Sequence, residues 1–147
     1  MYQIDIETGQ TEPIGPEGVR WPMAIAPDGT RVAATGPDHY PAIFSTAGEG
    51  PIASPGATVE DKVVQWSEDG RALFLYRRAQ PAGRALSVLI ERLDLESGER
   101  IEWQELRPGD AAGVLDIMPV LISSDGQRYA YGYRTMVSDL FIVSGLL

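Results

Sequence analysis

Two kinds of glycine-containing turn alternate along this chain of 147 residues, and their alternation constrains its fold more than any other feature. Asp-Gly occurs three times within a similar frame, at Asp28-Gly29, Asp69-Gly70 and Asp125-Gly126. A small residue followed by glycine occurs between them, at Thr8-Gly9, Ala47-Gly48, Ser97-Gly98 and Ser144-Gly145. Asp-Gly suits tight hairpins because both residues tolerate a positive φ, so we expect these dipeptides to be structural turns.

Short apolar segments with period-two alternation lie between the turns, as in residues 72–76 and 89–95. This pattern predicts an all-β domain. The Asp-Gly turns recur after 41 and 56 residues, and a period near 40 with four strands is typical of a propeller blade. The sequence therefore predicts a partial β-propeller of about three four-stranded antiparallel blades with incomplete end blades. Phe74, Tyr76, Trp66 and Trp103 are expected to pack between blades.

The expected strands divide residues 1–147, a single propeller segment, into four parts. Residues 1–14 end a preceding blade, 19–53 and 62–106 are complete blades, and 114–144 are an incomplete last blade. About three blades cannot close a ring of the usual four to eight. Either the chain is the C-terminal part of a longer propeller, or two or more copies complete a ring together. The first alternative is favoured because residue 1 lies in the middle of a blade.

The turn frames resemble the TolB-type propeller repeat, a relative of the WD repeat. Residues 66–71, Trp-Ser-Glu-Asp-Gly-Arg, are similar to its Trp-Ser-Pro-Asp-Gly-Lys frame, with Glu68 in place of proline. Residues 2–9 and 91–98 resemble its third strand and the following turn. Residues 129–146 are similar to the C-terminus of bacterial propellers attached to serine/threonine kinases, although no kinase signature is present. The resemblance implies a sensor or interaction module, and it favours a periplasmic or other extracytoplasmic location that the sequence alone does not identify.

Charge and composition exclude several classes of partner. The chain has 12 basic and 21 acidic residues and a net charge of −9, so we expect no nucleic-acid binding. No apolar run approaches the ~20 residues that span a bilayer. Cysteine is absent, which excludes disulfides and thiolate chemistry.

We expect no enzymatic activity, no catalytic residue, no cofactor and no metal site. His39 is the single histidine, and no nucleophile elbow, phosphate loop or dinucleotide fingerprint occurs. An enzyme with a metal in the propeller channel is an open alternative, for which Asp61 and Asp116 are the best ligands. Another alternative is the accessory propeller of a hydrolase whose catalytic domain lies outside this sequence.

The leading hypothesis is a non-catalytic binding or assembly module, the sensor or interaction part of a larger signalling protein. Its partner would be a protein or peptide, the remaining blades of the same propeller, or further copies that complete the ring. The blade topology places the longer connections on one face, where aromatic and arginine side chains commonly anchor partners. The candidate binding residues on that face are Arg20, Tyr40, Arg77, Arg78, Arg84 and Arg134. The alternative interpretation is that these are solvated loop residues and that Trp21 belongs to the core.

Overall fold

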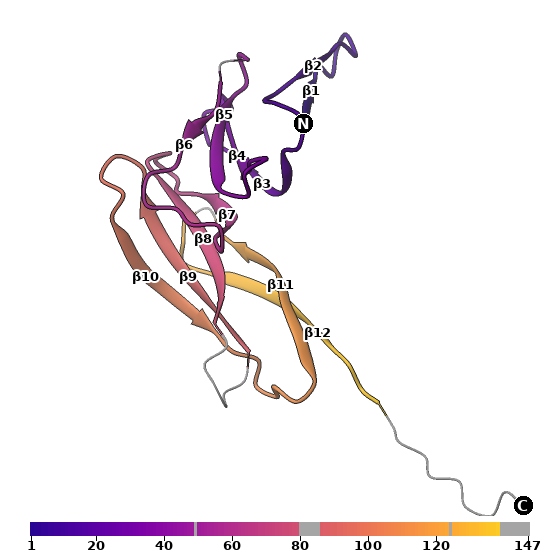
Figure 1. Ribbon diagram of the computed structural model, residues 1–147, viewed down its shortest axis with the longest axis vertical. Helices are drawn as coiled ribbons and strands as arrows, with labels where there is room; N and C mark the ends of the chain where they lie inside the picture. The colour runs from indigo at the N-terminus through magenta and orange to yellow at the C-terminus, as the bar shows by residue number, and fades with distance from the viewer. Residues whose placement is uncertain (49, 80–85, 124, 139–147) are drawn as a thin grey trace, which may run out of the picture.

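The computed structural model describes residues 1–48, 50–79, 86–123 and 125–138. Within these ranges the chain forms twelve strands in antiparallel pairs and no helix. The prediction of an all-β, antiparallel fold is therefore confirmed. Figure 1 shows that the strands form small sheets that follow one another from the indigo N-terminus towards the yellow C-terminal segment.

Two hairpins flank two four-stranded sheets, and in each sheet the strands lie in chain order. The N-terminal hairpin contains β1 (Tyr2–Ile4) and β2 (Thr11–Pro13). The first sheet contains β3 (Arg20–Ile25), β4 (Arg31–Thr35), β5 (Pro41–Ser45) and β6 (Ile52–Ala53). The second sheet contains β7 (Lys62–Trp66), β8 (Ala72–Ala79), β9 (Ser87–Asp94) and β10 (Arg100–Leu106). The C-terminal hairpin contains β11 (Val114–Ile122) and β12 (Tyr129–Thr135). The expected turn at Ser144-Gly145 and the strand expected before it lie outside the described residues.

The three Asp-Gly turns share one design, in which only the glycine has a positive φ. Gly29, Gly70 and Gly126 have φ values of 72°, 66° and 65°. The aspartates do not share this conformation, because His39 is the one non-glycine residue with a positive φ among the described residues. Each aspartate instead stabilises its turn through hydrogen bonds that its carboxylate accepts. The Asp28 carboxylate, for example, accepts hydrogen bonds from the Thr30 amide (2.9 Å) and hydroxyl (2.8 Å).

The turns at Gly9 and Gly98 depend on an aspartate four residues earlier, which the sequence analysis did not single out. The Asp94 carboxylate accepts hydrogen bonds from the Glu96 amide (3.0 Å), the Ser97 amide (2.8 Å) and the Ser97 hydroxyl (2.9 Å). Asp5 accepts the equivalent three bonds in the first hairpin. These bonds lower the pKa of both aspartates, the bonds from Ser97 and Thr8 being the largest cause.

The sheets pack face to face in chain order, and a separate apolar core fills each contact. The core between the first and second sheets contains the buried residues Ala26, Ala33, Ile43, Val63, Trp66, Leu73, Leu75 and Leu93. The core between the second sheet and the C-terminal hairpin contains Phe74, Leu86, Val88, Ile90, Leu106, Ile117, Val120 and Ile122. A smaller core beside the N-terminal hairpin contains Ile14, Val32, Ala34 and Phe44.

Alternation along the strands explains why both faces of each four-stranded sheet contribute side chains to an apolar core. On β4, Ala33 packs towards the second sheet, whereas Val32 and Ala34 pack towards the N-terminal hairpin. On β8, Leu73 and Leu75 face the first sheet and Phe74 faces the C-terminal hairpin. Trp66 and Phe74 are buried in these cores, and Tyr76 and Trp103 pack against the second of them. Trp21 is not a core residue, because 68% of it is exposed.

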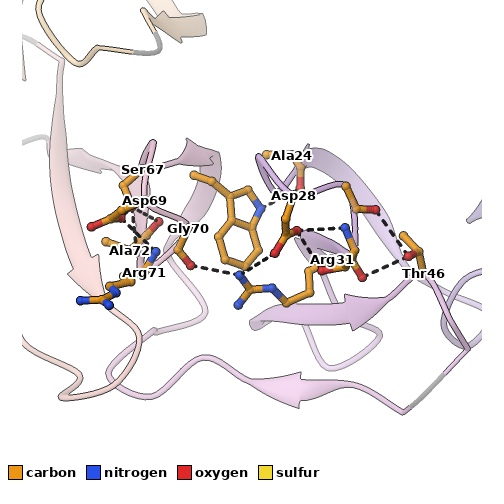
Figure 2. A network of polar contacts seen from close by, with 12 residues as sticks. Ala24, Asp28, Arg31, Thr46, Ser67, Asp69, Gly70, Arg71 and Ala72 are labelled. Atoms are coloured by element: carbon orange, nitrogen blue, oxygen red, sulfur yellow. Dashed lines mark hydrogen bonds and ion pairs between the residues drawn. The ribbon is translucent and has the colours of Figure 1, made fainter.

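A polar and aromatic contact joins the first Asp-Gly turn to the second (Figure 2). The Arg31 guanidinium donates to the Gly70 carbonyl at 3.2 Å and to the Asp28 carboxylate at 3.4 Å. It also lies 4.7 Å from the centre of the Trp66 ring, in a cation–π contact. The Trp66 indole N–H donates to the Ala24 carbonyl at 3.0 Å. These contacts cross from one sheet to the next and hold their turns side by side.

Candidate functional site

The strand register sorts the connections onto two edges of the stacked sheets. Within the described residues, the Asp-Gly turns and the turns at Gly48 and Gly98 lie at one edge. The connection from β4 to β5 and the connections between sheets lie at the opposite edge, which we call the loop edge. Arg20 at the start of β3 is opposite Thr35 at the end of β4, and Lys62 at the start of β7 is opposite Tyr76. The candidate binding residues come from strand ends and connections at or near this loop edge.

The structure places these candidate residues in different settings. Arg20 lies beside the β4–β5 connection, where a guanidinium nitrogen is 3.3 Å from His39 Nδ1. Tyr40 is 46% exposed in the same connection. Arg134 is exposed on β12, opposite Asp116 in the strand register. Arg84 lies outside the described residues.

A cavity of about 580 Å³ opens beside Tyr40. Its walls are mainly apolar, and they include Pro16, Pro37, Tyr40, Pro41, Phe44 and Pro51. The Asp38 carboxyl also belongs to the lining. The volume falls within the range of roughly 300–1,000 Å³ that is usual for ligand sites. The cavity can therefore accommodate an apolar group as large as an aromatic side chain.

The connection that presents Tyr40 is held by its own backbone. The Gly36 amide donates to the Tyr40 carbonyl at 2.8 Å, and the His39 amide donates to the Gly36 carbonyl at 3.0 Å. The Asp38 carboxylate accepts a hydrogen bond from the Tyr40 amide at 3.1 Å. His39 has a φ of 73°, a left-handed conformation that costs a non-glycine residue of order 1–3 kcal/mol. Since unusual backbone conformations concentrate at functional sites, this conformation supports the assignment of a site here.

Two buried hydroxyls lie close to the cavity. Ser54 belongs to its lining, and Thr35 precedes the lining residue Gly36. Neither Ser54 Oγ nor Thr35 Oγ1 has a hydrogen-bond partner among the described residues. A buried hydroxyl without a partner costs about 1–3 kcal/mol, so both groups retain hydrogen-bonding capacity that the fold does not use.

Arg77 belongs to an ion-pair network on the face of the second sheet that meets the first. Its Nε lies 3.1 Å from the Glu91 carboxylate. Arg100 also binds Glu91, at 2.6 Å, and it forms two bonds of 2.8 Å to the fully buried Asp61 carboxylate. The Thr58 amide donates to Asp61 at 2.6 Å. Burial alone would raise the pKa of Asp61, but the bonds from Arg100 and Thr58 together lower it.

Arg78 lies on the other face of β8, beside the C-terminal hairpin. Its guanidinium donates to the Asp116 carboxylate at 2.5 Å. With Tyr76, Lys62 and Glu60, Arg78 lines a hollow of about 490 Å³. Burial, and then the charge of Asp116, raise the pKa of the Tyr76 hydroxyl.

Asp61 is paired with Arg100 through both carboxylate oxygens, and Asp116 is paired with Arg78 through Oδ1. In the described ranges no group of three or more histidine or acidic side chains is arranged to hold a metal ion. The same ranges contain no helix long and apolar enough to cross a membrane. Comparison with protein-family models, curated proteins and solved structures found no significant match to this chain.

The sequence analysis identified Tyr40 but not the apolar walls around it. A signal was present in residues 36–41, Gly-Pro-Asp-His-Tyr-Pro, because two prolines flanking a tyrosine make a stiff connection that exposes an aromatic ring. Phe44 and Pro51 carried no such signal. They reach the cavity only because β5 pairs with β6.

Proposed function

We propose that this chain is a segment of a β-propeller that serves as a non-catalytic binding and assembly module, as the sensor or interaction part of a larger signalling protein. The apolar cavity beside Tyr40 is the observation that carries the binding function. A protein or peptide partner inserts an apolar side chain there, and Asp38 in the lining and Arg20 beside His39 provide polar anchors. Aromatic and arginine residues commonly dominate such contacts.

The packing of the sheets supports the propeller part of the proposal. In a propeller, four-stranded meanders follow one another around an axis and their first strands lie innermost. Here β3 and β7, the first strands of the two complete sheets, lie side by side, and β11 lies next to β7. Side-chain bonds connect successive sheets, including one from Gln65 Nε2 to the Ser123 carbonyl at 3.3 Å.

The turn chemistry supports the same interpretation. The Asp-Gly design recurs at each connection between the first and second strands of a unit, and the Asp-X-X-Ser/Thr-Gly design recurs at Asp5 and Asp94. The proposed location is extracytoplasmic, on the basis of the resemblance to TolB-like repeats.

Peptide selection tests the binding function. A phage library of random dodecapeptides is panned against the full chain, and recovered peptides are titrated against wild type and Tyr40→Ala by fluorescence polarisation. We expect recovered peptides to share an apolar residue and to lose at least tenfold in affinity with Tyr40→Ala. Tyr133→Ala is the matched control, because Tyr133 is exposed to a similar extent (50%) on β12, outside the cavity. Equal losses in both variants, or none in Tyr40→Ala, would contradict the proposal.

A further inference from the structure

The hollow beside the C-terminal hairpin is a second candidate site, and it shares no lining residue with the cavity beside Tyr40. It has a volume of about 490 Å³ and is lined by Glu60, Lys62, Tyr76 and Arg78. We propose that this hollow binds a free α-amino acid. The two cationic side chains and the tyrosine hydroxyl hold the carboxylate of the ligand, and Glu60 holds its ammonium group.

The strand register brings the three donor side chains to one surface. Lys62, at the start of β7, lies opposite Tyr76 on β8. Neighbouring strands lie roughly 4.8 Å apart, and alternate residues of one strand face the same side of the sheet. Arg78, two residues after Tyr76, therefore shares its face of β8. An ammonium, a hydroxyl and a guanidinium group thus approach the hollow from the same side.

Three of the lining groups have hydrogen-bonding capacity that the described part of the chain does not use. The side chains of Lys62 and Glu60 form no hydrogen bond or ion pair with the described residues, and the Tyr76 hydroxyl forms no hydrogen bond with them. Lys62 and Tyr76 are half-buried, and burial is the main cause that raises the pKa of Tyr76. The raised pKa keeps this hydroxyl protonated near neutral pH, so it remains a donor.

Arg78 is held in position by its ion pair and still has donors to offer. One guanidinium nitrogen donates to Asp116 Oδ1 at 2.5 Å, and the Ile117 amide donates to the same oxygen at 2.9 Å. The Asp116 side chain is only 10% exposed, whereas that of Arg78 is 56% exposed. Because a guanidinium group carries five N–H donors, Arg78 can bind a second carboxylate without losing the first.

The balance of charge at the hollow favours a zwitterion over a simple anion. The charges of Arg78 and Asp116 compensate each other, and the unpaired Lys62 and Glu60 carry one charge of each sign. An α-amino acid offers a carboxylate and an ammonium group close together, so each charge meets its opposite. A phosphate would face two carboxylates and a chain of net charge −9. The volume lies within the range usual for ligand sites and leaves space for the side chain of the ligand.

Binding measurements on the full chain test the inference. The common L-amino acids are screened at millimolar concentration by thermal shift, and each one that binds is titrated by calorimetry. We expect at least one to bind, and we expect its two analogues, one without the amino group and one without the carboxylate, to bind at least tenfold more weakly.

Substitutions at the hollow assign the binding to these residues. Lys62→Met and Glu60→Gln should each weaken binding of the amino acid at least tenfold. Glu102→Gln is the matched control, because Glu102 is an exposed carboxylate on β10 outside the hollow, and it should bind as wild type does. Circular dichroism spectra should be the same for all variants.

The position of the ligand can be observed directly, because Lys62 is the only lysine in the sequence. Selective carbon-13 labelling of lysine therefore gives NMR signals from this side chain alone, and they should shift when the amino acid is added.

Four outcomes would overturn the inference. They are no binding of any amino acid in the millimolar range, equal binding of the analogue without an amino group, unchanged binding in Lys62→Met and Glu60→Gln, and unshifted Lys62 signals. Peptide binding that depends on Tyr40 is measured separately, so the proposed function and this site can fail independently.

Discussion

Replacing Arg100 by methionine should destabilise the fold because it leaves a buried carboxylate without its cation. Asp61 is fully buried, and the Arg100 side chain is 21% exposed. Removing one partner of a buried pair costs about 3–5 kcal/mol. Asp61 keeps the bonds from the Thr58 amide and hydroxyl, and Glu91 keeps Arg77, so the lower end of this range applies. With a urea m-value of about 2 kcal/mol/M, a loss of ~3 kcal/mol lowers the unfolding midpoint by about 1.5 M.

The effect should depend on pH with a definite sign. In the wild type the pKa of folded Asp61 lies below its ordinary value, so its stabilisation is present above about pH 3.9 and is lost as the pH falls through the folded pKa. Without Arg100, burial raises the pKa of folded Asp61, and the variant is penalised increasingly as the pH rises above the unfolded value. The stability difference should therefore be larger at neutral pH than at about pH 4.5.

Urea unfolding of both proteins, followed by tryptophan fluorescence at the two pH values, measures this difference. Arg71→Met is the matched control, because the Arg71 side chain is exposed at a turn, and it should change stability by less than about 0.5 kcal/mol. A loss under about 1 kcal/mol for Arg100→Met, or a loss that does not diminish in acid, would show that the Asp61–Arg100 pair does not stabilise the fold as we argue.

Substitutions at two further positions, Trp66 and Asp94, test the contact between sheets and the turns. Trp66→Phe removes the indole donor to the Ala24 carbonyl and part of a buried ring, and it should cost about 2 kcal/mol in urea unfolding, whereas Trp21→Phe, at an exposed site, should cost little. Asp94→Ala should lower the urea midpoint near neutral pH, and Asp94→Asn should preserve most of it because an amide oxygen still accepts the three bonds. The loss in Asp94→Ala should shrink in acid, because the depressed pKa of Asp94 means that its contribution is lost when the carboxylate is protonated. Equal midpoints for the alanine and asparagine variants would show that the side-chain oxygen is not what holds the turn.

The turns were predictable because their chemistry is local. Each turn needs a glycine with a positive φ and an aspartate one or four residues before it. The hydrogen bonds that the aspartate accepts come from residues two or three positions along the chain, so the whole turn lies within a few residues of sequence. The Asp-Gly frame was recognised, but its mechanism was not, since the dipeptide alone does not reveal that the aspartate acts through its carboxylate. The aspartate at the other turn design was overlooked, although Asp-X-X-Ser/Thr-Gly is repeated at Asp5 and Asp94.

The candidate site was only partly predictable. Tyr40 could be placed on an exposed connection from its flanking prolines, but Arg77 and Arg78 look alike in sequence and lie on opposite faces of one strand. Each contacts a carboxylate 14 or 38 residues away, Glu91 or Asp116. No local pattern shows that an arginine is already paired with such a distant residue.

Period-two alternation and repeated turn residues thus sufficed to specify antiparallel strands and their order along the chain, because these features depend on neighbours within a few residues. Which sheet faces meet, which carboxylate each arginine neutralises and where a cavity remains open were settled only when distant segments packed together. Those properties arise from contacts such as Arg100 with Asp61, 39 residues apart, in which burial and geometry outweigh local preference.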